Sequence, residues 1–257
     1  MNIKNPNWSE EEIKMAISIY CKIPFLKTRK TSPEIIRWAK IIGRSPGGLY
    51  TKLCNLGHCD KGVQNMGFKG LSHIGKLDPI VWEEFQQDPE KFIFESEQLL
   101  AERMGKTIEE YAELRLEDIP EGKTREIVVR QRVNQRFFHE AVLISYNNQC
   151  CITGINIPSL LEACHISSWK DDPKNRTNPK NGLCMTPTFH RAYDKFLMAI
   201  TPDYEIVLSD EMLIRTQDKN TLIYLNNIQG QRIRMPEKFA PERDFLSQHY
   251  NDFKQHH

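Results

Sequence analysis

The feature that most limits the fold of this chain is a group of polar residues between residues 162 and 194. Residues 161–169 read LEACHISSW, a short stretch that favours a strand over a helix. Farther along the chain, the pair Asn181-Gly182 is typical of a turn, and Thr186 followed by Pro187 is typical of the start of a helix. This part of the chain therefore predicts a strand, a turn and a helix.

Cys164 and His165 stand next to each other in the predicted strand. Such a pair could be a cysteine nucleophile with its base, a set of zinc ligands, or something else. Adjacent side chains of a strand point to opposite faces, so these two residues are not expected to form a thiolate-imidazole pair. A papain-like mechanism would need another histidine.

His190 and Asp194 are four residues apart in the predicted helix. This separation places both side chains on one helical face, where they can bind the same cation. An imidazole and a carboxylate with open remaining positions suit Mg²⁺, Mn²⁺ or a catalytic transition metal better than a closed structural zinc site.

Residues 136–201 resemble the HNH (ββα-metal) endonuclease family. The resemblance is carried by YNNQCCITG, LLEACHISSW, RTNPKN with Gly182 and Leu183, and FHRAYDKFLMAIT. It implies a β-hairpin packed on a helix, with one metal where they meet, and an enzyme that hydrolyses the phosphodiester bonds of double-stranded DNA. The segments NPNWSEEEIKMAISIY and GRSPGGLYTKLCNL are similar to the leading region of restriction-type members, which implies a role in restriction or phage defence.

The resemblance also implies roles for individual residues. His165 would be the general base that activates water, and Asn181 would orient His165 through its amide or approach the metal. His190 and Asp194 would hold one divalent ion, and His190 corresponds to the last histidine of the family motif. We expect Mg²⁺ first, with Mn²⁺, Ni²⁺ or Zn²⁺ as alternatives. Arg176 is a candidate phosphate contact.

The chain departs from the family at Cys164, where many relatives carry an Asp or His ligand. A thiolate is a poor partner for Mg²⁺. We favour a packing role for Cys164, and the alternative is a softer metal. Glu162 lies on the same strand face and could substitute as a ligand. Relatives with a structural zinc carry two CxxC pairs, whereas CITG and CMTP keep only the first cysteine of each. We therefore expect no four-thiolate zinc site.

The N-terminal sequence predicts three short helices. Ser9 and Glu12 form a capping box, and the next two helices would start at Ser32-Pro33 and Ser45-Pro46. Gly43 would end the second helix. Residues 8–56 thus suggest a helix-turn-helix type of unit whose last helix would carry DNA contacts from Arg44, Tyr50 and Lys52. The alternative is a helical bundle with a solvated basic face.

Charge is segregated along the chain. Residues 1–60 contain 10 Lys/Arg and 5 Asp/Glu, whereas residues 61–120 contain 7 and 13. A basic end followed by an acidic middle indicates a charged partner. The acidic helical segment 78–118 would pack on the first unit or act as a spacer. We place a DNA-recognition region at 1–118, a linker at 119–130 and the HNH domain at 131–257, which makes the fold α+β, with a mostly helical N-terminal domain.

Composition limits the setting in which the chain works. Seven cysteines without a regular framework indicate reduced thiols, and no apolar run approaches the roughly 18 residues of a membrane span. We expect a cytoplasmic protein that acts on DNA as a homodimer or with a defence-system partner. Two alternatives remain: a nuclease controlled by a partner or ligand, whose N-terminal half binds protein, and a catalytically silent DNA-binding protein.

Overall fold

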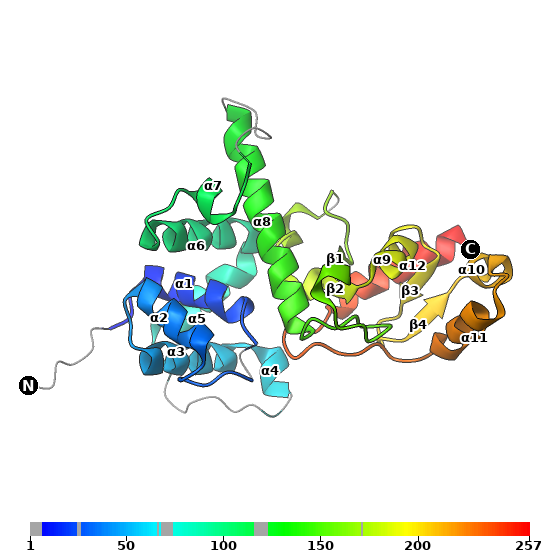
Figure 1. Cartoon of the computed structure of the whole chain (residues 1–257), viewed down its shortest axis with the longest axis horizontal. Helices are drawn as coiled ribbons and strands as arrows, with labels where there is room; N and C mark the ends of the chain where they lie inside the picture. The colour runs from blue at the N-terminus through cyan, green and yellow to red at the C-terminus, as the bar shows by residue number, and fades with distance from the viewer. Residues whose placement is uncertain (1–6, 25–26, 66, 68–73, 116–122, 171) are drawn as a thin grey trace, which may run out of the picture. The chain divides into compact units, whose positions relative to one another are not determined.

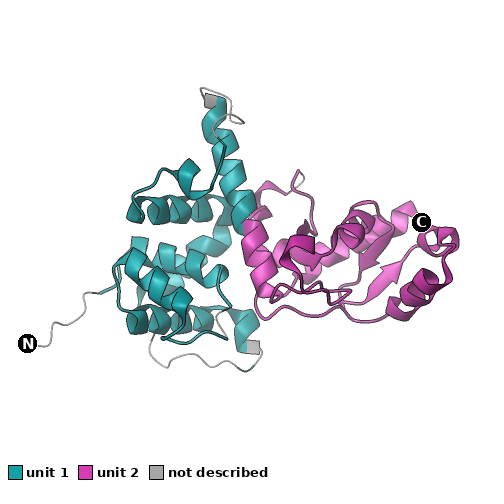
Figure 2. Cartoon of the chain, viewed as in Figure 1, with its two compact units in different colours: residues 1–137 teal, residues 138–257 magenta. Residues whose placement is uncertain are grey.

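The computed structural model describes residues 7–24, 27–65, 67, 74–115, 123–170 and 172–257 (Figure 1). Helices predominate in these residues, with two small antiparallel sheets of two strands each, so the α+β class is confirmed. The chain divides into two compact units, residues 1–137 and 138–257 (Figure 2). No helix in the described ranges has the length and apolar character needed to cross a membrane.

Unit 1 is built from helices. Its elements are α1 (Glu10–Cys21), α2 (Pro33–Ile42), α3 (Pro46–Cys59), α4 (Lys61–Asn65), α5 (Leu77–Gln87), α6 (Pro89–Arg103), α7 (Ile108–Tyr111) and the first part of α8 (Lys123–Ser145). The three predicted N-terminal helix starts are confirmed. Both hydrogen bonds of the Ser9–Glu12 capping box are present, and Gly43 ends α2 in the left-handed conformation.

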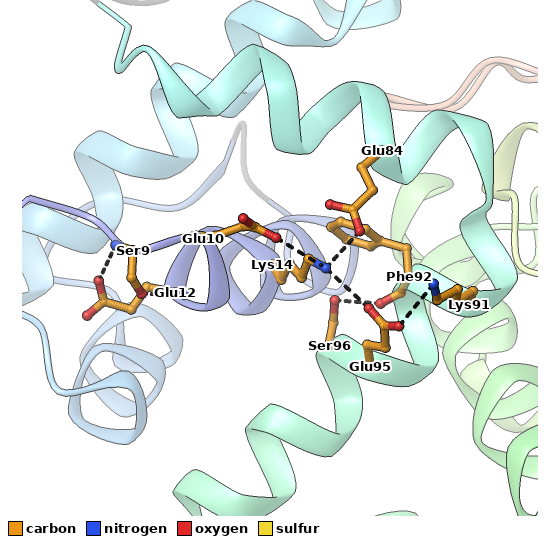
Figure 3. A network of polar contacts seen from close by, with 9 residues as sticks. All are labelled: Ser9, Glu10, Glu12, Lys14, Glu84, Lys91, Phe92, Glu95 and Ser96. Carbon is orange, nitrogen blue, oxygen red and sulfur yellow. Dashed lines mark hydrogen bonds and ion pairs between the residues drawn. The ribbon is translucent and has the colours of Figure 1, made fainter.

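Ion pairs join the basic N-terminal helices to the acidic segment of the same unit. Lys14 Nζ lies 2.7 Å from Glu84 Oε1 and 3.2 Å from Glu95 Oε2 (Figure 3). Lys22 Nζ lies 2.7 Å from Glu97 Oε1, with both side chains almost fully buried. The acidic helices α5 and α6 therefore pack on α1, and much of the charge segregation is neutralised inside unit 1.

Two residues expected to contact DNA belong to this internal pairing. The guanidinium of Arg44 pairs with Glu12, and its Nε donates to Glu12 Oε1 at 2.8 Å. Lys52 is only 4 % exposed and pairs with Asp78, which is fully buried. A buried charge must be paired to be tolerated, so both cations are used inside unit 1, and their contact with DNA stays a prediction. Tyr50 is half-buried, and its contact with DNA stays a prediction.

Unit 2 begins inside α8. Its further elements are β1 (Glu162–His165), β2 (Gly182–Met185), α9 (Pro187–Asp194), β3 (Met198–Ile200), β4 (Ile206–Leu208), α10 (Asp210–Arg215), α11 (Lys219–Ile228) and α12 (Arg243–His256). Of the linker expected at 119–130, residues 123–130 are helical, and residues 119–122 lie outside the described residues. The helix continues because Val129 and Val133 are buried against Ala112.

The β1–β2 hairpin lies on the end of α8 within unit 2. Gly182 starts β2 with φ −129° and ψ 143°, which is ordinary extended backbone, so it does not serve the turn that the Asn-Gly pair predicts. A Cβ at this position would overlap Val142 Cγ2 and lie 3.0 Å from Phe138 Cζ. Glycine is therefore required here because the strand approaches the helix closely.

Candidate active site

The hairpin sorts the polar residues of β1 onto two faces. Glu162, Ala163, Cys164 and His165 pair with Met185, Cys184, Leu183 and Gly182. Side chains alternate along a strand, so Glu162 and Cys164 share one face and His165 lies on the other. This alternation agrees with the expectation that Cys164 and His165 do not act as a thiolate-imidazole pair.

His165 is held by two aromatic side chains and one carbonyl group. Its ring stacks on Phe138 at a centroid distance of 3.7 Å and meets the edge of Trp169 at 5.4 Å. Its Nε2 lies 2.9 Å from the carbonyl oxygen of Arg176. The two aromatic side chains set the plane of the His165 ring, and the carbonyl group engages its Nε2.

The Arg176 carbonyl also decides the tautomer of His165. A carbonyl oxygen can only accept a hydrogen bond, so Nε2 carries the proton and Nδ1 keeps its lone pair. Burial lowers the pKa of His165 to about 4, and the charges of His190 and Arg176 add to the effect, while the hydrogen bond to Arg176 opposes it. The imidazole is therefore neutral near pH 7 and can accept a proton through Nδ1.

His190 is oriented from the strand by Glu162. Its Nδ1 lies 2.7 Å from Glu162 Oε2, and its Nε2 lies 3.5 Å from Asp194 Oδ2. The carboxylate of Glu162 accepts a hydrogen bond from Nδ1–H, so Nε2 carries the lone pair and faces Asp194. The i to i+4 spacing within α9 thus brings His190 and Asp194 together, as the sequence predicts.

Cys164 lies beside this pair. One ligand atom each from Cys164, His190 and Asp194 lies within 4.8 Å of the other two. Cys164 is fully buried, whereas the side chains of His190 and Asp194 are 25 % and 55 % exposed. Burial, followed by the charges of Asp194 and Glu162, raises the pKa of the Cys164 thiol well above its usual range. Sulfur, nitrogen and oxygen donors converge here and remain open to solvent on one side, which fits a divalent metal.

The side-chain amide of Asn181 is hydrogen-bonded to backbone groups of the loop between β1 and β2. Asn181 is 1 % exposed, its Oδ1 accepts from the Ser167 amide at 2.7 Å, and its Nδ2 donates to the carbonyls of Ser167 at 3.1 Å and Asn175 at 3.3 Å. Both ends of the amide are used by the loop between β1 and β2, and its action on His165 or on the metal stays a prediction. Asn181 secures the loop that carries the Arg176 carbonyl.

Arg176 contributes to the site in a way that sequence reasoning missed. Its side chain is directed to Trp169, with Nε donating to the Trp169 carbonyl at 2.6 Å and the guanidinium 5.1 Å from the ring centroid. Its backbone carbonyl holds His165. No sequence signal marks a carbonyl for this role. A phosphate contact by the Arg176 side chain stays a prediction.

Other basic side chains of unit 1 are exposed and were not singled out from the sequence. They lie on α2 and on the loop before it: Arg29, Lys30, Arg37 and Lys40. The guanidinium of Arg37 lies 4.8 Å from the ring centroid of Trp38. A cluster of two lysines and two arginines within twelve residues was visible in the sequence, but only the structure separates these cations from the internally paired Arg44 and Lys52.

Comparison with known families agrees with this geometry. A family model described as HNH endonuclease matches residues 150–201, which include β1, β2, α9 and β3. A search of curated proteins found no match to this chain.

Proposed function

Residues 150–201 form a domain of the HNH endonuclease family, and we propose that the chain is a metal-dependent endonuclease that hydrolyses DNA phosphodiester bonds. The observation that carries the proposal is the hydrogen bond between His165 Nε2 and the Arg176 carbonyl. It gives the neutral imidazole the tautomer of a general base. The donors of His190 and Asp194 lie in the same unit, at the end of α9.

His165 acts on the attacking water. Its Nδ1 lone pair accepts the proton as the water oxygen attacks phosphorus, and stacking on Phe138 keeps the ring in place. The carbonyl of Arg176 stabilises the imidazolium that forms, because its oxygen accepts from Nε2 in both protonation states. Asn181 supports this carbonyl by securing the loop.

His190 and Asp194 would hold one divalent ion through Nε2 and a carboxylate oxygen. When bound, this ion supplies electrostatic stabilisation of the negative charge that develops on the phosphate and on the leaving 3′ oxygen. Glu162 keeps Nε2 of His190 available by accepting a hydrogen bond from Nδ1–H.

The test is cleavage of supercoiled plasmid by the purified chain with Mg²⁺, Mn²⁺, Ni²⁺ or Zn²⁺. His165→Ala should lower the rate about 100-fold to 10,000-fold, the usual contribution of a general base, while metal binding persists. His139→Ala is the matched control, because His139 is an exposed histidine of α8 in the same unit. A fully active His165→Ala variant would show that His165 is not the general base. No cleavage with any of the four metals would favour the catalytically silent alternative.

Unit 1 is the part we assign to DNA recognition, and the exposed cations Arg29, Lys30, Arg37 and Lys40 support this assignment. Replacing Arg37 and Lys40 by alanine should weaken binding of the full chain to duplex DNA. A plot of the logarithm of the binding constant against the logarithm of the salt concentration should also become less steep. Its slope should change by about 0.9 for each lost phosphate contact. Lys91→Ala is the control, since Lys91 is 63 % exposed but lies on the acidic helix α6. If the affinity for DNA and the slope of its salt dependence are both unchanged, the alternative in which unit 1 binds a protein partner is favoured.

The biological role rests on the N-terminal resemblance to restriction-type members of the family. It supports a function in restriction or phage defence against modified or foreign DNA, with a homodimer cutting both strands. Cleavage of a panel of modified and unmodified DNAs would test the target, and sedimentation with and without DNA would test the dimer.

A further inference from the structure

We propose that Cys164 is the third protein ligand of the metal site and that its thiolate makes the site prefer Zn²⁺ or Co²⁺ over Mg²⁺. The inference rests on the proposed function, because it concerns the metal of the same site. It differs from the expectation that Cys164 is a packing residue and that Mg²⁺ is the preferred ion.

The positions of the three donors fit one small ion. The distance between His190 Nε2 and Asp194 Oδ2 is 3.5 Å, and the ligand atom of Cys164 lies within 4.8 Å of both residues' ligand atoms. Bond lengths to zinc of about 2.0–2.3 Å place the ligand atoms of a tetrahedral site roughly 3.3 to 3.6 Å apart. The His190–Asp194 distance already has this value, and small side-chain movements would bring the three ligand atoms, which lie within 4.8 Å of one another, into this range.

The backbone determines where the sulfur lies. Cys164 is fully buried in a hairpin whose register is set by pairing of Cys164 with Leu183 and of His165 with Gly182. The Cys164 thiol donates a hydrogen bond to the His165 carbonyl, with 3.5 Å between sulfur and oxygen. A thiol is a weak hydrogen-bond donor, so the sulfur can bind an ion without losing a strong hydrogen bond.

Glu162 is not counted among the oxygen ligands of the metal. Its Oε2 accepts from His190 Nδ1 at 2.7 Å, so the carboxylate orients the histidine ligand. In the described residues around this cluster, Asp194 is then the carboxylate left to bind the ion. One sulfur, one imidazole nitrogen and one carboxylate oxygen form the donor set.

This donor set matches the chemistry of a catalytic zinc ion. Mg²⁺ requires near-octahedral coordination by oxygen and keeps several of its waters. Thiolate and imidazole select Zn²⁺ and similar ions, and three protein ligands leave a fourth position for water or a phosphate oxygen. Binding replaces the thiol proton of Cys164 by the metal, and the proton passes to the buffer.

The experiment is a titration of the full chain with Co²⁺ in the absence of DNA, with the absorption spectrum recorded at each step. Cobalt bound to a thiolate gives a sulfur-to-metal charge-transfer band in the near ultraviolet, and we expect the band to saturate at one Co²⁺ per chain. Zn²⁺ should abolish the band by displacement, and a large excess of Mg²⁺ should not. In Cys164→Ser the band should be lost and the affinity for Zn²⁺ should fall on the order of 100-fold.

Cys184→Ser is the matched control. Cys184 is also fully buried in the same hairpin, but it pairs with Ala163 and therefore lies on the opposite face from Cys164. This variant should keep both the band and the affinity. The inference is overturned if the saturated wild-type protein shows no charge-transfer band, or if the band persists in Cys164→Ser. The wild-type titration decides the first point even if Cys164→Ser fails to fold.

The titration separates this inference from the proposed function. A charge-transfer band at saturation with no cleavage of any DNA would count against the proposed nuclease activity and support Cys164 as a metal ligand. Cleavage of DNA with Mg²⁺, together with no charge-transfer band when Co²⁺ binds, would support the nuclease activity. The same result would overturn the role of Cys164 as a metal ligand. Displacement of Co²⁺ by equimolar Mg²⁺ would overturn the preference for the softer ion.

Discussion

Replacing Gly182 by alanine tests the close approach of the active-site hairpin to α8. The added methyl group would overlap Val142 Cγ2 and lie 3.0 Å from Phe138 Cζ and 3.2 Å from the Pro179 carbonyl oxygen. Carbon atoms in good contact are about 3.5–4.0 Å apart. Val142 is 1 % exposed and β-branched, so its side chain cannot rotate away without strain. The strand must therefore move away from the helix.

The expected cost follows from these overlaps. Overpacking a well-filled core typically destabilises a protein by about 1–3 kcal/mol, and contacts on three sides place this site near the upper end. Alanine recovers about 0.5–1 kcal/mol, because glycine loses more backbone entropy on folding. The net loss in the free energy of unfolding should be about 2 kcal/mol, which lowers the ratio of folded to unfolded protein about 30-fold.

Urea unfolding followed by circular dichroism measures this loss, which should lower the midpoint by about 1 M at an unchanged slope. Gly47→Ala is the control: Gly47 lies in α3 with nothing within 4 Å of the added Cβ, so it should gain stability. Adding Val142→Ala to Gly182→Ala should recover at least about 1 kcal/mol relative to the sum of the single changes. A Gly182→Ala protein as stable as the wild type, or strict additivity, would refute the packing argument.

Three further predictions concern polar side chains and their partners. Burial lowers the pKa of His249 to about 4, with the Tyr193 carbonyl and Asp252 opposing the shift, so only the unfolded chain binds its proton between about pH 6.5 and 4. Stability should fall by about 3 kcal/mol as the pH drops through this window, and urea titrations of His249→Phe should lack this component. Asp78→Ala should destabilise the chain by about 3–5 kcal/mol in the same assay, because Lys52 is left as an unpaired buried charge; a loss below 1 kcal/mol would contradict this account. Glu162→Ala should weaken metal binding about 10- to 100-fold in calorimetry by freeing the ring of His190, and unchanged affinity would show that the Glu162 hydrogen bond does not orient the ligand.

Local sequence was sufficient to predict the features that depend only on neighbouring residues. The capping box at Ser9, the Pro33 and Pro46 helix starts and the Gly43 helix end were all predicted, because each depends on contacts within one turn of helix. The pairing of His190 with Asp194 was predictable for the same reason, since both belong to one helical face. The family could be identified because its motif residues occur in a regular order along the chain.

Only the tertiary structure decided which partner each polar group receives. Lys52 meets Asp78 and Arg44 meets Glu12 across 26 and 32 residues, so cations that look available in the sequence are paired inside unit 1. His165 is oriented by the backbone carbonyl of Arg176, a group that every residue carries and that no sequence pattern marks. The sequence by itself determined where the N-terminal helices and α9 begin, because each start depends on neighbouring residues. Their partners depend on the approach of distant segments, because burial and hydrogen bonding are set by the packing of the whole unit.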